Sequence, residues 1–168
     1  APTIASVSDA SAIEAASIVH TVTLSNPSAV ATTYSLSLSD GSATGGGTDY
    51  TSTLSNAAFS NGVSLAAGVI TVPAGVSSFT VTVPTTADTL DEADETYTLS
   101  VGAASGSGTL VDDDGAPAIA TVTSDTQLEG LSLVHTATLS NPSSVATTVA
   151  YSPGGGTATG GRTDHTTP

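Results

Sequence analysis

The sequence has no cysteine, and a single basic side chain, Arg162, stands against fifteen acids, which gives a formal net charge of −14. Without cysteine, neither a disulfide framework nor a thiolate metal site can form. The negative charge argues against nucleic acids and anionic membrane surfaces as partners. No apolar run approaches the roughly 20 residues of a membrane span, so no direct membrane insertion is expected. A secreted chain of this kind needs another source of stability, and a bound metal ion is one.

Aromatic residues make up only 4% of the chain, and no segment keeps a helical period. Instead, Val, Ile and Leu alternate with Thr and Ser, which is typical of strands that bury one face. Turn residues such as Asn26-Pro27 and Asp40-Gly41 separate these segments. The pattern predicts an all-β fold, an antiparallel immunoglobulin-like β-sandwich. Strands are expected over residues 4–8, 18–24, 32–38, 50–54, 69–73, 79–83, 96–101 and 108–111, with a longer loop over 56–67.

The chain repeats itself at a constant shift. Val19-His-Thr-Val-Thr-Leu-Ser-Asn-Pro-Ser28 returns as Val134-His-Thr-Ala-Thr-Leu-Ser-Asn-Pro-Ser143, and about 29 of 53 aligned positions are identical. The period is too long for a solenoid and fits a whole domain. Residues 1–115 are therefore predicted to form one complete β-sandwich repeat that ends in an acidic linker, and residues 116–168 the N-terminal half of a second repeat.

Two short segments hold about half of the acids. They are Ala87-Asp-Thr-Leu-Asp-Glu-Ala-Asp-Glu95 and Val111-Asp-Asp-Asp-Gly115. Two carboxylates about 4 Å apart repel by roughly 4 kcal/mol at an effective dielectric constant of 20. Such clusters need a cation or must stay apart in water, and calcium suits several oxygen ligands on flexible loops. The alternative is that the acids are solvated turns that keep the protein soluble.

The predicted strands favour the calcium interpretation. The strand over 96–101 begins directly after Glu95, and the strand over 108–111 ends at Asp112. Antiparallel neighbours place the start of one strand beside the end of the next, so both acidic segments are expected at one end of the sandwich. Glu14, between the first two strands, and Asp49, after a glycine-rich turn, are expected to reach the same end.

Several motifs of the first repeat occur in the order found in a known family. They are Thr21-Val-Thr-Leu-Ser-Asn-Pro27, Asp40-Gly-Ser-Ala-Thr44, Ile70-Thr-Val-Pro-Ala-Gly75, Asp91-Glu-Ala-Asp-Glu-Thr-Tyr97 and Gly108-Thr-Leu-Val-Asp-Asp-Asp114. Together they resemble the Calx-β family, sandwich modules of sodium–calcium exchangers, integrin chains and giant bacterial surface proteins. The resemblance implies Ca²⁺ ligands at Glu14, Asp49, Asp88, the backbone carbonyl of Leu90, Glu92, Asp112, Asp113 and Asp114.

Two departures from the exchanger pattern affect this expectation. Ala87 and Thr89 stand where the exchanger-type loop carries acids, which suggests fewer ions. The 56–67 segment is longer than is usual in the family. Two histidines, His20 and His135, recur at one strand position, and we expect them to be packed and hydrogen-bonded side chains rather than metal ligands.

Together these features predict a structural calcium-binding extender repeat of a large secreted bacterial surface protein, such as an adhesin, a biofilm protein or a surface fibre. Its partners would be neighbouring repeats and other copies of itself. One alternative is a subunit of a self-assembling extracellular filament, in which a neighbouring chain completes the half domain by strand addition. A second is a module that recognises a ligand through the 56–67 loop. No nucleophile elbow or phosphate-binding loop is present, so an enzyme is not expected.

Overall fold

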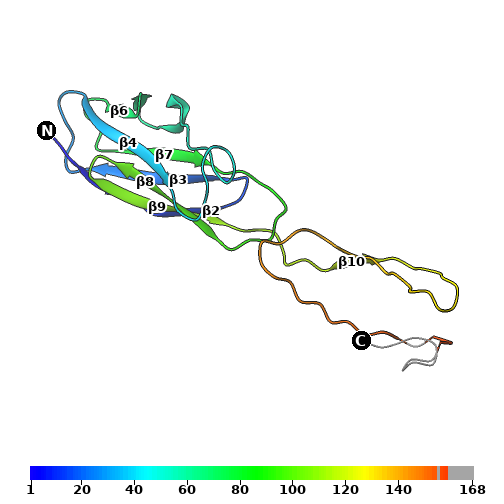
Figure 1. The fold of residues 1–168 in the computed structure, drawn as a ribbon. Coiled ribbons are helices and arrows are strands. Elements are labelled where there is room, and N and C mark those ends of the chain that lie inside the picture. The colour runs from blue at the N-terminus through cyan, green and yellow to red at the C-terminus, as the bar shows by residue number, and fades with distance from the viewer. Residues whose placement is uncertain (155, 159–168) are drawn as a thin grey trace. The chain divides into compact units, whose positions relative to one another are not determined.

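A computed structural model describes residues 1–154 and 156–158 of the chain (Figure 1). The chain forms two compact units, Ala1–Gly115 and Ala116–Pro168, and the boundary falls where the sequence repeat begins again. The described residues include no helix that is long and apolar enough to cross a membrane.

The first unit is a β-sandwich, which confirms the predicted all-β class. One layer is a three-stranded sheet in the order β1-β3-β7, and the other is a six-stranded sheet in the order β2-β9-β8-β4-β6-β5 (Figure 1). The strands are β1 (Ile4–Val7), β2 (Ala10–Ile13), β3 (Ser17–Leu24), β4 (Thr32–Asp40), β5 (Ser64–Ala66), β6 (Val69–Val72), β7 (Ser78–Pro84), β8 (Glu95–Val101) and β9 (Ala104–Val111).

Alternation of apolar and polar residues builds the core between the two layers. In β7 every second residue is buried, and β3 and β8 show the same period. Burying a Val, Leu, Ile or Phe side chain contributes about 1.5–3 kcal/mol, so these strands hold the layers together. The largest fully buried side chains are Tyr50, Tyr97, Phe79, Ile18, Ile70, Leu99 and His20.

Three details of the predicted strand map were wrong. Residues 50–54 form no strand, and only Tyr50 makes an isolated bridge, to Thr85. The expected loop over 56–67 contains a short 3-10 helix, η1 (Asn56–Ala58), and the edge strand β5. The last strand begins earlier than expected, at Ala104, because the two-residue turn after Val101 leads directly into pairing with β8.

Strand β2 was not predicted, and it changes the topology. It pairs with β9 in parallel, from Ala10 opposite Gly108 to Ile13 opposite Val111, so the six-stranded sheet is mixed rather than purely antiparallel. Parallel partners end at the same edge of a sheet. The N–H of Glu14 accordingly donates to the carbonyl oxygen of Val111 at 3.3 Å, which places Glu14 beside the start of the acidic segment at Asp112.

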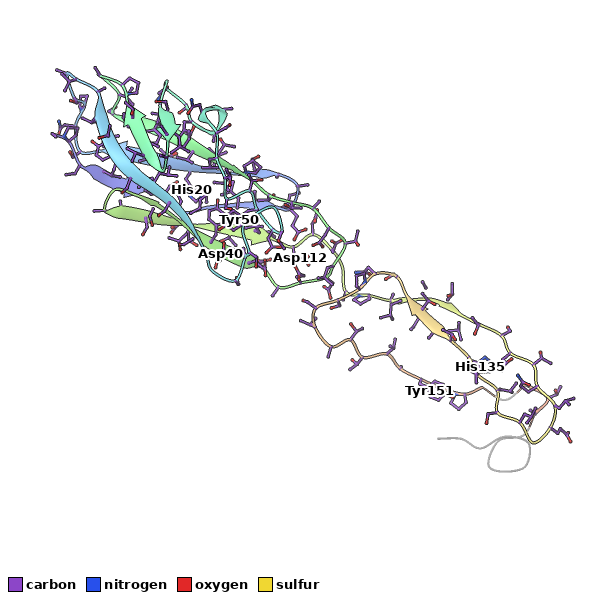
Figure 2. All side chains as sticks on the ribbon, turned by 45° about the horizontal axis from the view of Figure 1, so that its top comes forward. His20, Asp40, Tyr50, Asp112, His135 and Tyr151 are labelled. Atoms are coloured by element: carbon purple, nitrogen blue, oxygen red, sulfur yellow. The ribbon has the colours of Figure 1, made fainter. Side chains whose placement is uncertain are left out.

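A polar contact crosses the apolar core. His20, on β3, is fully buried, as the sequence predicted for a packed histidine (Figure 2). Its Nδ1 lies 2.8 Å from the carbonyl oxygen of Ser8, and its Nε2 lies 2.8 Å from the hydroxyl oxygen of Tyr97 on β8. The Tyr97 ring stacks on Tyr50, with ring centroids 4.5 Å apart.

The described part of the second unit has one pair of strands, β10 (Ile119–Val122) and β11 (Ala137–Leu139), which are antiparallel. All side chains of both strands are exposed. His135 is exposed too, so the prediction of a packed histidine fails at this position, although His135 Nδ1 lies 2.8 Å from the carbonyl oxygen of Thr123 (Figure 2). The histidine environment of the first unit is absent here because no described residue covers the face of the pair.

Candidate metal centre

The acidic side chains come from three loops at the end of the first unit where β2 and β9 finish. Glu14 directly follows β2, the 88–94 loop precedes β8, and Asp112–Asp114 directly follow β9. Figure 2 labels Asp112 at this end of the unit. Antiparallel pairing of β8 with β9 sets Glu95 opposite Leu110 and so brings the second and third loops together. Parallel pairing of β2 with β9 brings the first loop, which carries Glu14, to the same place.

A tight group forms between Glu14, Asp113 and Asp114. One carboxylate oxygen of each residue lies within 4.8 Å of those of the other two. Asp88 joins the group, because its N–H donates to Glu14 Oε2 at 3.3 Å. Burial raises the pKa of Glu14, and the negative charges of Asp88, Asp112 and Asp113 raise it further, against the lowering effect of the Asp88 N–H.

Two oxygens of this region have no hydrogen-bond donor. Asp112 Oδ1 and Asp114 Oδ2 are both sequestered from solvent, and neither has a partner. The backbone N–H of Asp112, by contrast, donates to Asp94 Oδ1 at 3.2 Å. Buried carboxylate oxygens are nearly always paired, since an unpaired one loses its hydration without compensation. A solvated acidic turn does not account for these two atoms.

A second group of acids lies around Asp49 and Glu92. The charges of Asp88, Asp49 and Asp112 raise the pKa of Glu92, after the larger effect of its burial. Asp49 is fixed in its turn, because its Oδ2 accepts a hydrogen bond from the N–H of Thr44 at 2.6 Å. The glycine-rich turn that holds it contains Gly46 and Gly47 at positive φ, as expected for a turn rather than a phosphate cradle.

Glu95 belongs to this second group, and the sequence did not single it out as a ligand. Burial and the charge of Asp49, to which Glu95 also hydrogen-bonds, raise the pKa of Glu95 to about 7. A protonated Glu95 donates to the Asp49 carboxylate and so relieves the repulsion between them. The sequence feature that could have identified Glu95 is its position as the first residue of a strand that directly follows an acidic segment.

Leu90 and Asp91 also belong to the acidic loop before β8. The N–H of Leu90 donates to Asp88 Oδ1 at 2.7 Å, which orders the loop, while a ligand role for the Leu90 carbonyl stays a prediction. Asp91 contributes through its charge, which together with those of Asp113, Asp112 and Asp88 raises the pKa of Asp114, after burial as the largest cause.

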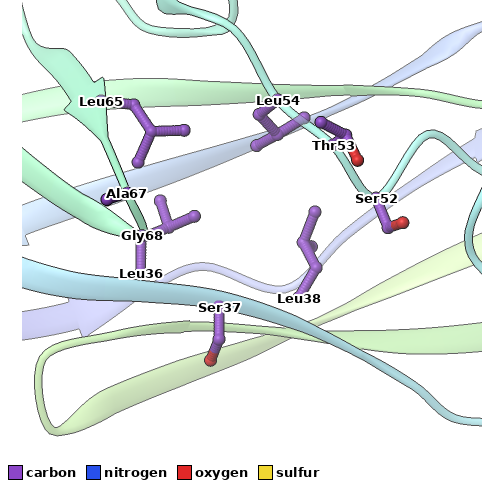
Figure 3. A pocket seen from close by; sticks show the side chains of 9 residues that line it. All are labelled: Leu36, Ser37, Leu38, Ser52, Thr53, Leu54, Leu65, Ala67 and Gly68. Carbon is purple, nitrogen blue, oxygen red and sulfur yellow. The ribbon is translucent and has the colours of Figure 1, made fainter.

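A groove on another part of the first unit has different chemistry. It encloses about 410 Å³ between β4, the 52–54 segment and the end of β5 (Figure 3). The side chains of Leu36, Leu38 and Leu54 point into it, whereas Ser37 points away (Figure 3). Among the described residues, leucines, small residues and the hydroxyl-bearing Ser52 and Thr53 line it, and no charged side chain does. Ligand recognition near the 56–67 segment stays a prediction.

The chain has a single Lys or Arg side chain, Arg162, which lies outside the described residues, so the described residues include none. The site is thus a set of oxygen donors with excess negative charge and two orphaned oxygens. This donor set fits a hard divalent cation.

The family model of the Calx-beta domain matches residues 4–126. The chain belongs to the Calx-beta domain family. Calx-beta domains are calcium-binding β-sandwich modules without enzymatic activity, so the predicted resemblance and the predicted absence of enzyme function both hold. The matched segment includes all the acidic residues described above.

A solved structure has the same fold. The crystal structure of CBD12 from CALX1.2 superposes with a TM-score of 0.51 at 15% sequence identity, covering 71% of this chain and 48% of that one. At this identity the likeness shows the Calx-beta fold alone, and the chain spans about half the length of that structure. None of the curated proteins compared with the chain matches it.

Proposed function

We propose that the first unit is a structural module that binds Ca²⁺ at the end where β2 and β9 finish. The observation that carries this proposal is the pair of sequestered, unpaired oxygens, Asp112 Oδ1 and Asp114 Oδ2. A cation is the partner that fits them. The carboxylates of Glu14, Asp113 and Asp114 lie close together and repel one another, and a positive ion between them would offset that repulsion.

The residues that would hold the ion are Glu14, Asp88, Asp112, Asp113 and Asp114, with Asp49, Glu92 and the Leu90 carbonyl on the neighbouring loops. All of these donors are oxygens on turns, the ligand type and flexibility that suit calcium. Magnesium demands a stricter octahedral geometry, and zinc favours nitrogen and sulfur. Among the described residues His20 is the one fully buried histidine, and it already contacts Ser8 and Tyr97.

Bound calcium would stabilise the folded module and would take no part in a chemical reaction. An affinity of about 10⁻⁴ to 10⁻³ M is typical of extracellular calcium modules. A ligand at a hundredfold excess over its dissociation constant adds about 2.7 kcal/mol to the free energy of unfolding. Because the acids would otherwise repel one another, the loops that carry them should be softer without the ion.

The position of the site in the chain suggests the wider role. Asp112–Asp114 stand only two residues before Ala116, where the second repeat begins. Ions held there would stiffen the joint between consecutive repeats of a secreted bacterial surface protein, such as an adhesin or a fibre. The weak expected affinity fits the millimolar calcium outside cells, and the lack of cysteine makes bound metal the stabilising element.

Titration calorimetry tests the binding step. We expect Ca²⁺ to release measurable heat with a dissociation constant near the stated range, and Mg²⁺ to bind at least about tenfold more weakly. The Asp114→Asn variant should weaken calcium binding by about tenfold or more. Glu129→Gln, the same kind of change at an exposed acid of the second unit, is the control. Absence of calcium heat in the unaltered chain would overturn the proposal.

Small-angle scattering tests the mechanical step separately. Chelation should lower the melting temperature and broaden the distribution of interatomic distances, because the joint loosens. If calcium binds in the calorimeter but chelation leaves both the melting temperature and the scattering unchanged, the ion has no structural role, and that part of the proposal fails.

A further inference from the structure

On the side that faces β6, strand β4 is paired along only part of its length. β6 pairs with residues 32–35 of β4, whereas β8, on the other side, pairs with residues 36–40. The turn between β5 and β6 ends the first ladder, because Ala67 and Gly68 both have positive φ and reverse the chain there. The last bond on this side runs from the Leu36 N–H to the Gly68 carbonyl oxygen at 2.8 Å. Beyond it, no described strand pairs with β4 on the β6 side.

The backbone of Leu38 points toward this unpaired side. The Ser35 carbonyl oxygen accepts from the Gly102 N–H at 2.9 Å on the β8 side, and the Leu36 N–H donates on the β6 side. Alternate residues of a strand direct their backbone groups to opposite neighbours. Leu38 therefore presents both its N–H and its carbonyl oxygen on the β6 side. An added antiparallel strand would use this donor and acceptor together.

The groove of about 410 Å³ lies where such a strand would run (Figure 3). Leu36 and Leu38 line it from β4, and Leu54 and Leu65 line it from the opposite side. All four leucines are half-buried and pack against the core of the sandwich. Side chains of an added strand that share the face of Leu38 would therefore enter an apolar groove of ordinary ligand-binding size.

The 52–54 segment forms the far wall of the groove and does not cover the β4 edge. The chain just before it is bonded to β7, in the other layer. The Thr51 N–H donates to the Pro84 carbonyl oxygen at 2.9 Å, and Tyr50 forms an isolated bridge with Thr85. The segment is thus held away from β4, and the groove remains between them.

The charge of the first unit selects the kind of partner. All but three of the fifteen acids lie within residues 1–115, which contain no Lys or Arg. Two copies of the chain therefore repel each other, whereas a basic segment is attracted. Asp40 lies two residues beyond Leu38, at the end of β4, and is exposed. The Tyr50 hydroxyl donates to Asp40 Oδ1 at 2.6 Å and so holds this carboxylate in place.

We propose that residues 36–40 of β4, with the groove beside them, bind an extended basic polypeptide segment by strand addition. The segment runs antiparallel to β4 and exchanges two backbone hydrogen bonds with Leu38. Its residue opposite Leu38 is aliphatic and enters the groove, and the residue two positions earlier is Lys or Arg and lies opposite Asp40. Main-chain bonds supply affinity, and the groove and the carboxylate supply specificity. The site shares no residue with the candidate metal centre.

Amide hydrogen exchange, followed by NMR on the isotope-labelled chain, tests the edge. The Leu38 N–H should exchange rapidly in the chain alone, whereas that of Ser37, which points to β8, should exchange slowly. The probe is a peptide with blocked ends and the sequence threonine-lysine-threonine-isoleucine-threonine. At saturation it should slow exchange at Leu38 by at least about fivefold and leave Ser37 unchanged. Slow exchange at Leu38 in the chain alone, or no slowing with the peptide, would overturn the proposal.

Methylation of the peptide backbone separates strand addition from simple apolar contact. A methyl group on the isoleucine nitrogen removes the hydrogen that bonds the Leu38 carbonyl oxygen. Binding should weaken by about tenfold, the equivalent of one backbone hydrogen bond. A methyl group on the nitrogen of the threonine just before the isoleucine is the matched control, because that nitrogen faces away from β4. Equal losses for the two peptides would rule out the proposed ladder, and neither peptide alters the protein.

The contact with Asp40 is tested by a double-mutant cycle. Replacing the lysine of the peptide by glutamine should weaken binding by about two- to fivefold, the range of an exposed ion pair. In the Asp40→Asn chain the same replacement should have little further effect. Asp9→Asn is the control, because the Oδ1 of Asp9, like that of Asp40, accepts a backbone N–H, from Ser107 at 2.8 Å and Gly45 at 2.9 Å respectively. Equal losses in the unaltered and Asp40→Asn chains would overturn the proposed register.

Discussion

Tyr97 donates its hydroxyl hydrogen to His20 Nε2 across 2.8 Å, and this bond links the two layers of the sandwich inside the core. The direction follows from the other ring nitrogen. Nδ1 lies 2.8 Å from the Ser8 carbonyl oxygen, which only accepts, so Nδ1 carries a proton, and in the neutral ring Nε2 is then the acceptor for the Tyr97 hydroxyl. Both ring nitrogens of His20 are thereby satisfied.

Removing the tyrosine hydroxyl should destabilise the first unit. Tyr97→Phe leaves the buried Nε2 without a donor, and we expect a loss of about 1–3 kcal/mol in the free energy of unfolding, measured with denaturant. Tyr34→Phe is the control, because the Tyr34 hydroxyl donates to the Pro2 carbonyl in a more exposed place and its loss should be smaller. Equal losses for the two variants would contradict the importance given to the core contact.

Glycine at position 108 should be irreplaceable. The Gly108→Ala methyl group would lie 2.2 Å from Tyr97 Cζ, so either the ring or the β9 backbone must move. We expect a loss of about 3 kcal/mol, at the upper end for overpacking a core. Gly115→Ala meets no atom within 4 Å and should change stability by less than about 0.5 kcal/mol. Thermal and denaturant unfolding of both variants decides the point.

Stability without calcium should fall as the pH rises from about 5 to 7.5. The pKa of Glu95 is raised to about 7 in the folded chain, whereas the ordinary value is 4.5, so between these pH values the folded state binds more protons than the unfolded state. Its stability therefore decreases with pH across that window. Melting temperatures in chelator at several pH values measure the slope. Glu95→Gln should flatten it, and an equally steep slope in that variant would assign the effect to other groups.

The effect of replacing Glu14 on the melting temperature should have opposite signs with and without calcium. Burial and neighbouring charges raise the pKa of Glu14, so its ionised form opposes folding when no cation is present. Glu14→Gln should raise the melting temperature in chelator and lower it in excess calcium, because a ligand is lost. Glu129→Gln, at the equivalent position of the second unit, should do neither. A change of one sign in both conditions would argue against Glu14 as a ligand.

Strong alternation made most of the fold predictable. Strands β3, β7 and β8 have clear periods of two and were expected within about one or two residues. Strand β2 was missed because Ala10-Ser-Ala-Ile13 has little apolar volume, and its position depends on a parallel partner almost a hundred residues away. Residues 50–54 look like a strand, yet Tyr50 is held by core stacking rather than by a ladder.

The part of the candidate site that depends on the antiparallel pairing of neighbouring strands could be predicted from the sequence. The approach of the 88–92 and 112–114 segments follows from the pairing of β8 with β9. The contact of Glu14 with this group was expected, but its cause, the parallel pair, was not. The Glu95–Asp49 pair and the orphaned oxygens were beyond reach, because they depend on side-chain positions in turns that no period fixes.

If the first unit bears tension, the parallel alignment of β2 with β9 determines which hydrogen bonds oppose it. Ile4 packs beside the Gly102 turn, so the chain enters at one end of the sandwich, whereas β9 leaves at the other. Tension between the two ends pulls β2 and β9 past each other along their length. The hydrogen bonds between β2 and β9 would then be loaded together in shear, and they would break together rather than one after another.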